Sequence, residues 1–313
     1  MSPSEPLISV LVPCYRGGTL IETCLTSLLR QDLQDPYEVI VIESTGDGSA
    51  ERLAASFPRC RVIAPPRRTW PAEAQNIGLR EARGAYVAIT NHDCIVPEGW
   101  LRLLLERHTA GHYAAVGGAV DNGTPTSAVG TAAYWAEFNE YAPNRPAGPV
   151  ASVPQCNVCF RRDVLIGPEP FPPVRFGAEE LTFHYRLVSA GGVIFFDPAI
   201  VVVHVNRTRL REYLMHQHTL GVGSAMARRM VPLPGRVLIR HRWLIPALPL
   251  VRIARVAARA ARQGPRPLAR VLALLPLLLA GYAAWALGFW EGARLPLDET
   301  RGNTGNGGGG RSR

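Results

Sequence analysis

Carboxylates occur at two places in the sequence where a single group-transfer site would need them. The first closes the segment 90–93, which ends in Asp93 and directly follows the apolar run 85–89. The second is Glu179-Glu180, which opens a segment with helical spacing. An acid just past a buried strand can hold a divalent cation against a diphosphate, and an acid pair elsewhere can supply a base to the same cleft. These residues favour chemistry on a nucleotide-activated substrate.

The first 118 residues alternate between short apolar segments and segments with helical spacing. The predicted strands are 7–12, 39–42, 60–64, 85–90 and 114–118, and the predicted helices are 19–31, 50–57, 71–83 and 98–111. This alternation is typical of a parallel, doubly wound sheet. Ligands of such sheets bind beyond the carboxyl ends of the strands, which is where Tyr15, Glu43 and Asp93 fall.

The regular alternation stops at 119–153, a region rich in Gly, Pro, Ala and Thr. We expect this region to be a long connection that covers the site as a partly ordered lid. Regular patterns then return as a strand over 155–160, a helix over 179–190, and two short strands over 193–196 and 200–204.

The net charge of +9 is concentrated in one segment. Residues 207–270 contain 14 arginines and a single acid, Glu212, whereas the rest of the chain is slightly acidic. Such a segment needs an anionic partner, which is an acidic lipid, a nucleic acid or a phosphorylated substrate. The following run, 271–290, carries no charge over 20 residues, a length just sufficient to span a bilayer. We therefore expect an anionic membrane surface as the partner and no nucleic acid.

The arginines at 252, 255, 259 and 262 form one stripe of a helix that precedes this run. The alternatives are that the stripe is a solvated face and that the run is a buried hairpin. If the run spans the membrane, the arginines before it place the main domain in the cytoplasm. We expect the protein at the cytoplasmic face of the cell membrane, either peripheral or spanning once.

The six cysteines are scattered, and Cys156 and Cys159 are the only close pair. A zinc site needs about four ligands, and no second Cys-x-x-Cys pair occurs. We therefore expect reduced thiols in a cytosolic domain, with two strand cysteines at 156 and 159.

A series of segments along residues 7–206 resembles the motifs of family 2 glycosyltransferases, and they occur in the order typical of that family. The segments are Val12-Pro13-Cys14-Tyr15-Arg16; Glu43-Ser44-Thr45-Gly46-Asp47-Gly48-Ser49; Ala74-Gln75-Asn76-Ile77-Gly78 with Ala82-Arg83-Gly84; Asn91-His92-Asp93 with Pro97 and Gly99-Trp100-Leu101; Asn157 with Arg161-Arg162-Asp163; Glu179-Glu180 with Arg186-Leu187 and Ala190-Gly191; and His204. Each motif is weak alone, and their common order carries the resemblance.

The resemblance implies a GT-A fold, an α/β architecture with a Rossmann-like, mostly parallel doubly wound sheet. It places a glycosyltransferase domain at 1–206, with a nucleotide half at about 1–118 and an acceptor half at about 119–206. The remaining expectations come from composition. They are basic amphipathic helices at 207–266, an apolar membrane-associated helix at 267–295 and a disordered tail at 296–313.

The resemblance also implies a role for individual residues. Tyr15 would pack on the base of the nucleotide, Glu43 would accept a hydrogen bond from that base, and Arg68 would meet the diphosphate. The residues implied to bind the donor are Pro13, Tyr15, Arg16, Glu43, Asp47, Arg68, Asn76 and Asn91, and those implied to bind the acceptor are Asn157 and Arg186.

Asp93 and His204 would hold Mg²⁺ or Mn²⁺, which offsets the charge of the leaving diphosphate. Glu180 would be the general base that deprotonates the acceptor hydroxyl, and Glu179 would orient the acceptor. The chain departs from the family at Glu43 and Asn91, where Asp is usual. An alternative for the acid pair is that it only opposes the helix macrodipole.

The leading interpretation is an inverting, metal-dependent glycosyltransferase that uses a nucleotide-sugar donor and a lipid-linked or polysaccharide acceptor. One alternative is a sugar nucleotidyltransferase, which would need a Gly-rich basic loop and usually a lysine, and the chain has no lysine. Another alternative is a catalytically weakened scaffold that binds a nucleotide sugar, which the altered acids Glu43 and Asn91 leave open.

Overall fold

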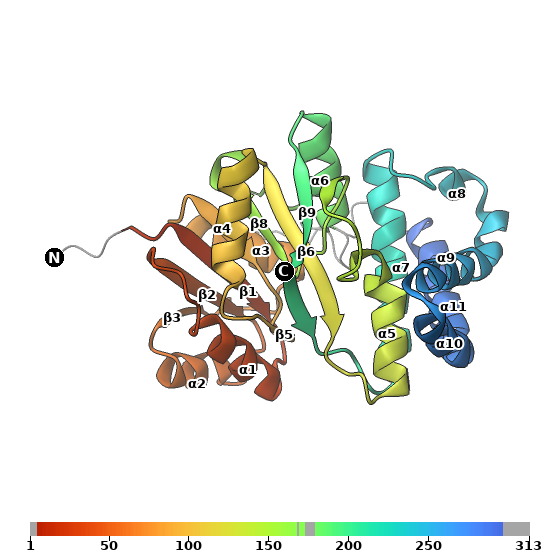
Figure 1. Cartoon of the computed structure of the whole chain (residues 1–313), viewed down its shortest axis with the longest axis horizontal. Coiled ribbons are helices and arrows are strands. Elements are labelled where there is room, and N and C mark those ends of the chain that lie inside the picture. The colour runs from red at the N-terminus through yellow and green to blue at the C-terminus, as the bar shows by residue number, and fades with distance from the viewer. Residues whose placement is uncertain (1–4, 168, 173–178, 297–313) are drawn as a thin grey trace, which may run out of the picture.

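The computed structural model describes residues 5–167, 169–172 and 179–296, and its centre is a sheet of nine strands (Figure 1). Within these residues the strand order is β3-β2-β1-β4-β8-β6-β9-β5, and β7 pairs with β9. The strands are β1 (Ile8–Cys14), β2 (Tyr37–Glu43), β3 (Cys60–Ile63), β4 (Tyr86–Ile89), β5 (Cys94–Ile95), β6 (Ala115–Asn122), β7 (Gly148–Val150), β8 (Val158–Arg161) and β9 (Ile194–His204). The predicted α/β fold is confirmed.

The first half of the sheet is parallel and is buried on both faces. Helices α1 (Gly18–Leu28), α2 (Ser49–Ser56) and α4 (Trp100–Gly111) pack on one face, and α3 (Pro71–Glu81) packs on the other. Alternate strand residues therefore enter different cores, with Val10 in one and Leu11 in the other. Burial on both faces explains why these strands are continuous apolar runs, which is the signal that located them.

The second half of the sheet mixes parallel and antiparallel pairs. β8 lies antiparallel between β4 and β6, and β9 lies parallel to β6. The two short strands predicted at 193–196 and 200–204 are one strand, because β9 continues through a bulge. There the pairing jumps from Gly118↔Asp197 to Ala119↔Val201.

The region 119–153, predicted as a long connection that forms a partly ordered lid, is instead largely regular secondary structure. It contains the end of β6, then α5 (Ala128–Phe138), the 3₁₀ helix η1 (Asn139–Tyr141) and β7. Ser127 caps α5, since its hydroxyl accepts a hydrogen bond from the backbone N–H of Gly130 at 3.0 Å. Eight of the 11 residues of α5 are buried, so the helix lacks the amphipathic pattern that would have marked it.

The C-terminal helices form a layer packed against α5, at the opposite end of the molecule from β3 (Figure 1). They are α7 (Leu210–Met230), α8 (Val237–Arg240), η3 (Arg242–Ala247), α9 (Leu248–Gln263), α10 (Pro265–Ala273) and α11 (Leu275–Gly292). α7 and α11 are in backbone contact. A Cβ atom on Gly221 would lie 2.0 Å from the carbonyl oxygen of Trp285, and one on Gly288 would lie 2.0 Å from that of His218. This approach is possible only with glycine at both positions.

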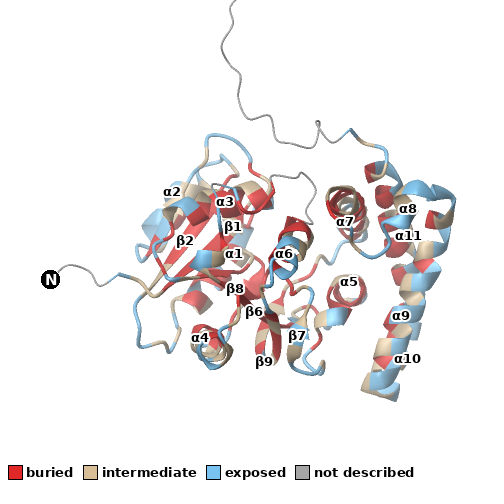
Figure 2. Cartoon of the chain, turned by 90° about the horizontal axis from the view of Figure 1, so that it is seen from above, coloured by how far each residue is buried: buried red, intermediate tan, exposed pale blue. Residues whose placement is uncertain are grey.

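The uncharged run 271–290 is therefore divided between two helices and is partly buried inside the protein (Figure 2). In the part of the chain that the structure describes, no individual helix has both the length and the apolar character needed to cross a membrane. α10 and α11 meet that test only when taken together, and they are bent by 67° at their junction.

The arginine stripe of α9 is also divided. Arg252 lies over the rings of Tyr282 and Trp285, with its guanidinium carbon 4.8 and 4.3 Å from their centroids. Arg259 pairs with Glu140 at 2.6 Å, whereas Arg255 and Arg262 are exposed. Two of the four arginines thus hold α9 against the protein.

Candidate active site

The carboxyl ends of the strands bring most of the predicted residues to one edge of the sheet. Cys14 and Glu43 are register partners at the ends of β1 and β2, so the loops that begin at Tyr15 and Ser44 leave the sheet side by side. At the other end of the same edge, His204 is the register partner of both Cys94 and Asn122. The strand pairing alone therefore places the nucleotide-binding and metal-binding candidates along one line.

Arg68 and Tyr15, which are far apart in sequence, are brought together at this edge. The Arg68 guanidinium carbon lies 4.2 Å from the centroid of the Tyr15 ring and 4.7 Å from that of Trp70. Two aromatic rings thus support an exposed cation that can meet a diphosphate. The neighbouring Arg67 is instead paired with Glu73 at 2.6 Å.

Glu43 is buried and organises the loops beside Tyr15. One of its carboxylate oxygens accepts a hydrogen bond from the backbone N–H of Thr45 at 2.7 Å. The Thr45 hydroxyl in turn accepts from the backbone N–H of Arg16 at 2.7 Å, where Arg16 has a positive φ of 54°. Burial, together with a hydrogen bond to Glu43, raises the pKa of the Cys14 thiol well above its usual value. Pro13 lies half-buried in β1 just before these loops.

Asp47 and Asn91 occupy turns at the same edge. The Asp47 carboxylate is exposed and accepts from the backbone N–H of Ser49 at 3.1 Å, and this turn leads into α2. The carbonyl of Asn91 accepts from the N–H of Cys94 at 3.1 Å, closing the turn that carries Asp93. Both residues therefore shape loops of the site through their own turns.

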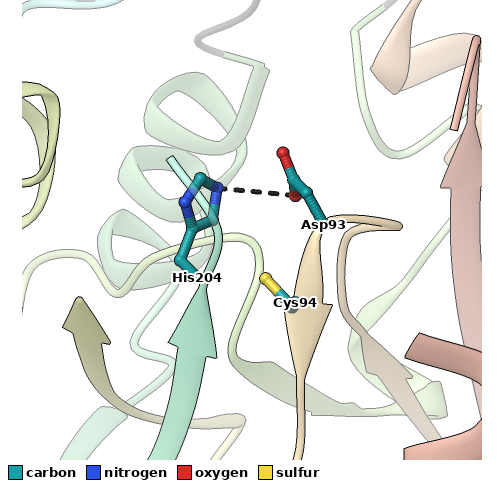
Figure 3. Close-up of side chains that lie close together, drawn as sticks. All are labelled: Asp93, Cys94 and His204. Carbon is teal, nitrogen blue, oxygen red and sulfur yellow. Dashed lines mark ion pairs between the residues drawn. The ribbon is translucent and has the colours of Figure 1, made fainter. Parts of the chain in front are cut away.

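Asp93 and His204 face each other in the buried part of the site (Figure 3). The Nε2 atom of His204 is 3.4 Å from Oδ1 of Asp93, and the Cys94 sulfur belongs to the same cluster, whose three donor atoms all lie within 4.8 Å of one another. Burial opposes ionisation of Asp93, but His204, His92 and Arg207 together outweigh it and lower the pKa of Asp93. Burial likewise disfavours charge on His204, but Asp93, Cys94 and Glu137 raise its pKa overall.

Asn206 fixes the orientation and tautomer of His204. Its amide nitrogen lies within hydrogen-bond distance of Asn122 Oδ1 at 3.0 Å and of Thr124 Oγ1 at 3.2 Å, so its oxygen faces Nδ1 of His204 at 3.0 Å. That oxygen can only accept, so Nδ1 carries the proton and a neutral His204 presents the lone pair of Nε2 to Asp93.

The residues at this point fit a divalent cation. Oδ1 of Asp93 is buried and makes no hydrogen bond within the described residues. A buried acceptor without a donor is costly, and a cation between Oδ1 and the Nε2 lone pair would satisfy both atoms. Carboxylate and imidazole are both common ligands of divalent metals.

Asn157 and Asn76 use their side chains inside the protein. The Asn157 amide donates to the carbonyls of Ala119 at 2.8 Å and Ile200 at 2.9 Å and accepts from the Trp100 indole at 2.8 Å, which bridges the bulge between β6 and β9. The Asn76 amide makes both of its bonds to the backbone of Phe171. The structure thus gives these two residues, predicted to bind acceptor and donor, roles in holding the fold.

The acid pair opens helix α6 (Glu179–Ser189). A turn of four residues joins α6 to β9, so the acidic end of the helix is directed back toward the edge where β9 ends (Figure 1). Glu179 is buried, and burial together with the negative charge of Glu180 raises its pKa to about 8. Glu180 is half-buried, and Arg186, at the other end of the helix, is exposed.

The raised pKa of Glu179 predicts that stability falls as pH rises. Between its ordinary pKa of 4.5 and about 8, the folded protein keeps a proton that the unfolded chain has released. The free energy of unfolding therefore declines across this window by up to about 1.4 kcal/mol per pH unit. Urea denaturation at several pH values should show this decline in the wild type and a shallower one in Glu179→Gln. Identical slopes for the two proteins would contradict the assignment.

Sequence reasoning missed the partners that surround His204. Glu137 on α5 and His216 on α7 form an ion pair at 3.0 Å, and despite its burial the pKa of Glu137 is lowered to about 2, chiefly by His216. Phe138 packs on the His204 ring with centroids 4.7 Å apart. Asn206 follows His204 by two residues. A side-chain amide this close to a strand-end histidine is the signal in the sequence that could have identified Asn206 as a residue that orients it.

Several known glycosyltransferases are similar in sequence to this chain. The model of the family "Glycosyl transferase family 2" matches residues 9–167. Glycosyltransferase AglE of Haloferax volcanii is 24% identical over 230 residues, which are 72% of this chain and 75% of that protein. The pre-mycofactocin glycosyltransferase of Mycobacterium tuberculosis is 25% identical over 233 residues, so the match spans 71% of this chain and only 47% of that protein.

Two solved structures share the fold. The mannosyltransferase PcManGT of Pyrobaculum calidifontis, in complex with GDP-Man and Mn²⁺, has a TM-score of 0.59 at 24% identity. The match covers 91% of this chain and 87% of the PcManGT chain. S. aureus TarS, in complex with UDP-GlcNAc, has a TM-score of 0.54 at 16% identity. The match covers 90% of this chain and 89% of the TarS chain. Because the family model matches just over half of the 313 residues, the chain belongs to glycosyl transferase family 2.

Proposed function

We propose that this glycosyltransferase moves a sugar from a nucleotide-sugar donor to a hydroxyl group, with inversion and with a divalent cation at Asp93 and His204. The observation that carries the proposal is the buried Asp93 oxygen, which has no hydrogen bond among the described residues and lies 3.4 Å from the His204 nitrogen. Arg68, supported by Tyr15 and Trp70, lies along the same edge of the sheet. The similar structures that hold GDP-Man with Mn²⁺ and UDP-GlcNAc support such a donor.

Different residues along this edge of the sheet would bind the base and the diphosphate of the donor. The Tyr15 ring would stack on the base, with Glu43 holding the adjacent loop in place. The Arg68 guanidinium would fork onto diphosphate oxygens. A bound Mg²⁺ or Mn²⁺ would neutralise the charge that grows on the leaving diphosphate.

Glu180 is the better candidate base of the acid pair. Glu179 is buried and, with a pKa of about 8, keeps its proton at neutral pH. It is therefore a poor proton acceptor near pH 7, whereas the negative charge of the half-buried Glu180 helps to raise the pKa of Glu179. Attack by an acceptor hydroxyl that Glu180 deprotonates, on the face opposite the leaving diphosphate, inverts the anomeric carbon.

A ligand screen tests the donor proposal directly. The full chain is heated with a panel of nucleotide sugars, with Mn²⁺, with Mg²⁺ and with chelator. A true donor at about 100 times its Kd stabilises the folded state by about 2.7 kcal/mol. We expect stabilisation by at least one nucleotide sugar, larger with metal than with chelator. Binding that is unaffected by chelator would contradict the metal proposal, and failure of every nucleotide sugar would contradict the donor proposal.

We further propose that the acceptor is a lipid-linked or polysaccharide acceptor at the cytoplasmic membrane face, reached by docking through the C-terminal helices. Large apolar side chains are exposed there, including Trp243 at 74% and Leu250 at 66%. Arg240 and Arg242 closely precede Trp243 and are exposed as well. Tryptophan beside arginine is typical of surfaces that bind the headgroup region of anionic membranes.

The membrane proposal predicts that Trp243→Glu with Leu250→Glu weakens binding to vesicles that contain anionic lipid. Each buried side chain contributes about 1.5–3 kcal/mol, so the loss should be at least about tenfold. Co-sedimentation of the full chain with vesicles measures it. Ile166→Glu is the matched control, because Ile166 is 80% exposed but lies on the catalytic domain. Equal vesicle binding by the double variant and the control would refute the docking surface.

A further inference from the structure

Cys94 supplies a third donor atom to the Asp93–His204 pair. Its sulfur, the Asp93 carboxylate and the His204 nitrogen all lie within 4.8 Å of one another (Figure 3). We propose that Cys94 is a metal ligand and that the site consequently binds borderline ions such as Zn²⁺ and Co²⁺ more tightly than Mg²⁺. This inference rests on the proposed metal site at Asp93 and His204.

The sheet itself imposes this arrangement. Cys94 on β5 and His204 on β9 are direct register partners in an antiparallel pair. Side chains of opposed residues project to the same face, about 5 Å apart at Cβ, so the thiol must lie beside the imidazole. Asp93 is the residue before Cys94, in the turn that leads into β5, and its carboxylate reaches the same point. The backbone N–H of Val205 fixes this turn by donating to the Asp93 carbonyl at 2.8 Å.

The separation of the His204 and Asp93 donor atoms suits a four-coordinate ion. Two ligands that each bind Zn²⁺ at about 2.1 Å in tetrahedral geometry lie about 3.4 Å apart. The Nε2 and Oδ1 atoms of His204 and Asp93 are 3.4 Å apart. Octahedral Mg²⁺, with bonds of about 2.1 Å at right angles, would need about 3.0 Å between neighbouring ligands. The pair is therefore already spaced for the smaller coordination number.

Ligand chemistry and burial point the same way. Thiolate and imidazole prefer Zn²⁺ and Co²⁺, whereas Mg²⁺ prefers oxygen ligands and keeps several waters. Cys94 is fully buried, and His204 and Asp93 are only 3% and 9% exposed, so the three side chains are largely shielded from water. Three protein ligands leave one position open, as in catalytic zinc sites.

Cys156 provides the matched control, since its thiol forms a hydrogen bond with the Cys94 thiol yet does not belong to the three-residue cluster. Replacing it changes a neighbouring buried sulfur and leaves the proposed ligand set intact. Cys94→Ser, by contrast, replaces the proposed ligand sulfur with a hydroxyl oxygen. Cys94→Asp replaces that sulfur with a hard oxygen ligand.

The experiment uses the full chain stripped of metal and then titrated with Co²⁺. A cobalt–thiolate bond gives a sulfur-to-metal charge-transfer band in the near ultraviolet, together with the strong visible bands of tetrahedral Co²⁺. We expect both in the wild type and in Cys156→Ser, and loss of the charge-transfer band in Cys94→Ser. Competition against Mn²⁺, followed by the electron paramagnetic resonance of free Mn²⁺, should show that Zn²⁺ binds Cys94→Ser at least ~10-fold more weakly than wild type. Cys94→Asp should shift the preference toward Mn²⁺.

Asp93→Ala distinguishes a failure of the proposed metal site from a failure of the proposed Cys94 ligand. If it abolishes Co²⁺ and Mn²⁺ binding while Cys94→Ser leaves the cobalt spectrum and zinc affinity unchanged, the metal site stands and the thiolate ligand is refuted. If Asp93→Ala leaves metal binding intact, the metal site itself is wrong. Far-ultraviolet circular dichroism confirms that each variant is folded before its spectrum is interpreted.

Discussion

Replacing Asp93 by alanine should abolish metal-dependent binding of the nucleotide sugar while leaving the protein folded. The carboxylate is buried, faces His204 at 3.4 Å and has an oxygen without a hydrogen-bond donor among the described residues. Its loss removes a charged ligand and with it several kcal/mol of attraction to the cation, so donor affinity in the presence of Mn²⁺ should fall by ~10² or more. Isothermal titration calorimetry with and without Mn²⁺ measures this loss.

Two further variants make the result specific. Asp163→Ala removes an exposed acid that pairs with Arg161 at 3.0 Å, and it should bind donor like the wild type. Asn91→Asp adds a carboxylate two residues before Asp93, and it should keep or strengthen metal affinity because it restores a charge. Unchanged metal and nucleotide affinity in Asp93→Ala would show that the cation, if one is used, binds elsewhere.

The nucleotide half of the fold could be predicted because its strands are buried on both faces. Such strands are continuous apolar runs, and the ends of those runs place Tyr15, Glu43 and Asp93 without knowledge of the packing. His204 was located in the same way, as the last residue of an apolar strand. Its pairing with Cys94 was not predictable, because β5 has only two residues and leaves no periodic signal.

The rest depends on contacts between segments that are distant in sequence. Helix α5 is buried on nearly all sides, so its small apolar residues read as an irregular connection. Asn157 had the residue type of a ligand contact, but it bonds the backbone on both sides of a bulge that only the paired strands reveal. Arg252 was predicted to belong to a basic stripe that faces an anionic membrane, and only the packing of α9 shows it over two aromatic rings of α11.

Replacing Glu180 by glutamine should stop sugar transfer while preserving donor binding. Glutamine keeps the size of the side chain but cannot accept a proton, and general-base catalysis contributes about 10²–10⁴-fold to such reactions. Release of nucleoside diphosphate in the presence of acceptor should therefore fall by at least ~10². The affinity for the nucleotide sugar should change little, because the base acts on the acceptor and not on the diphosphate.

Glu179→Gln is a closely matched control, since it alters the adjacent acid of the same helix. Burial and the charge of Glu180 hold the pKa of Glu179 at about 8, so near pH 7 this residue is already neutral and glutamine mimics it. Transfer by Glu179→Gln should remain within about tenfold of wild type, since the charge available to accept the proton is unchanged. If Glu179→Gln loses transfer and Glu180→Gln keeps it, then the buried acid loses its proton when the acceptor binds. In that case Glu179 is the base and Glu180 only orients the acceptor.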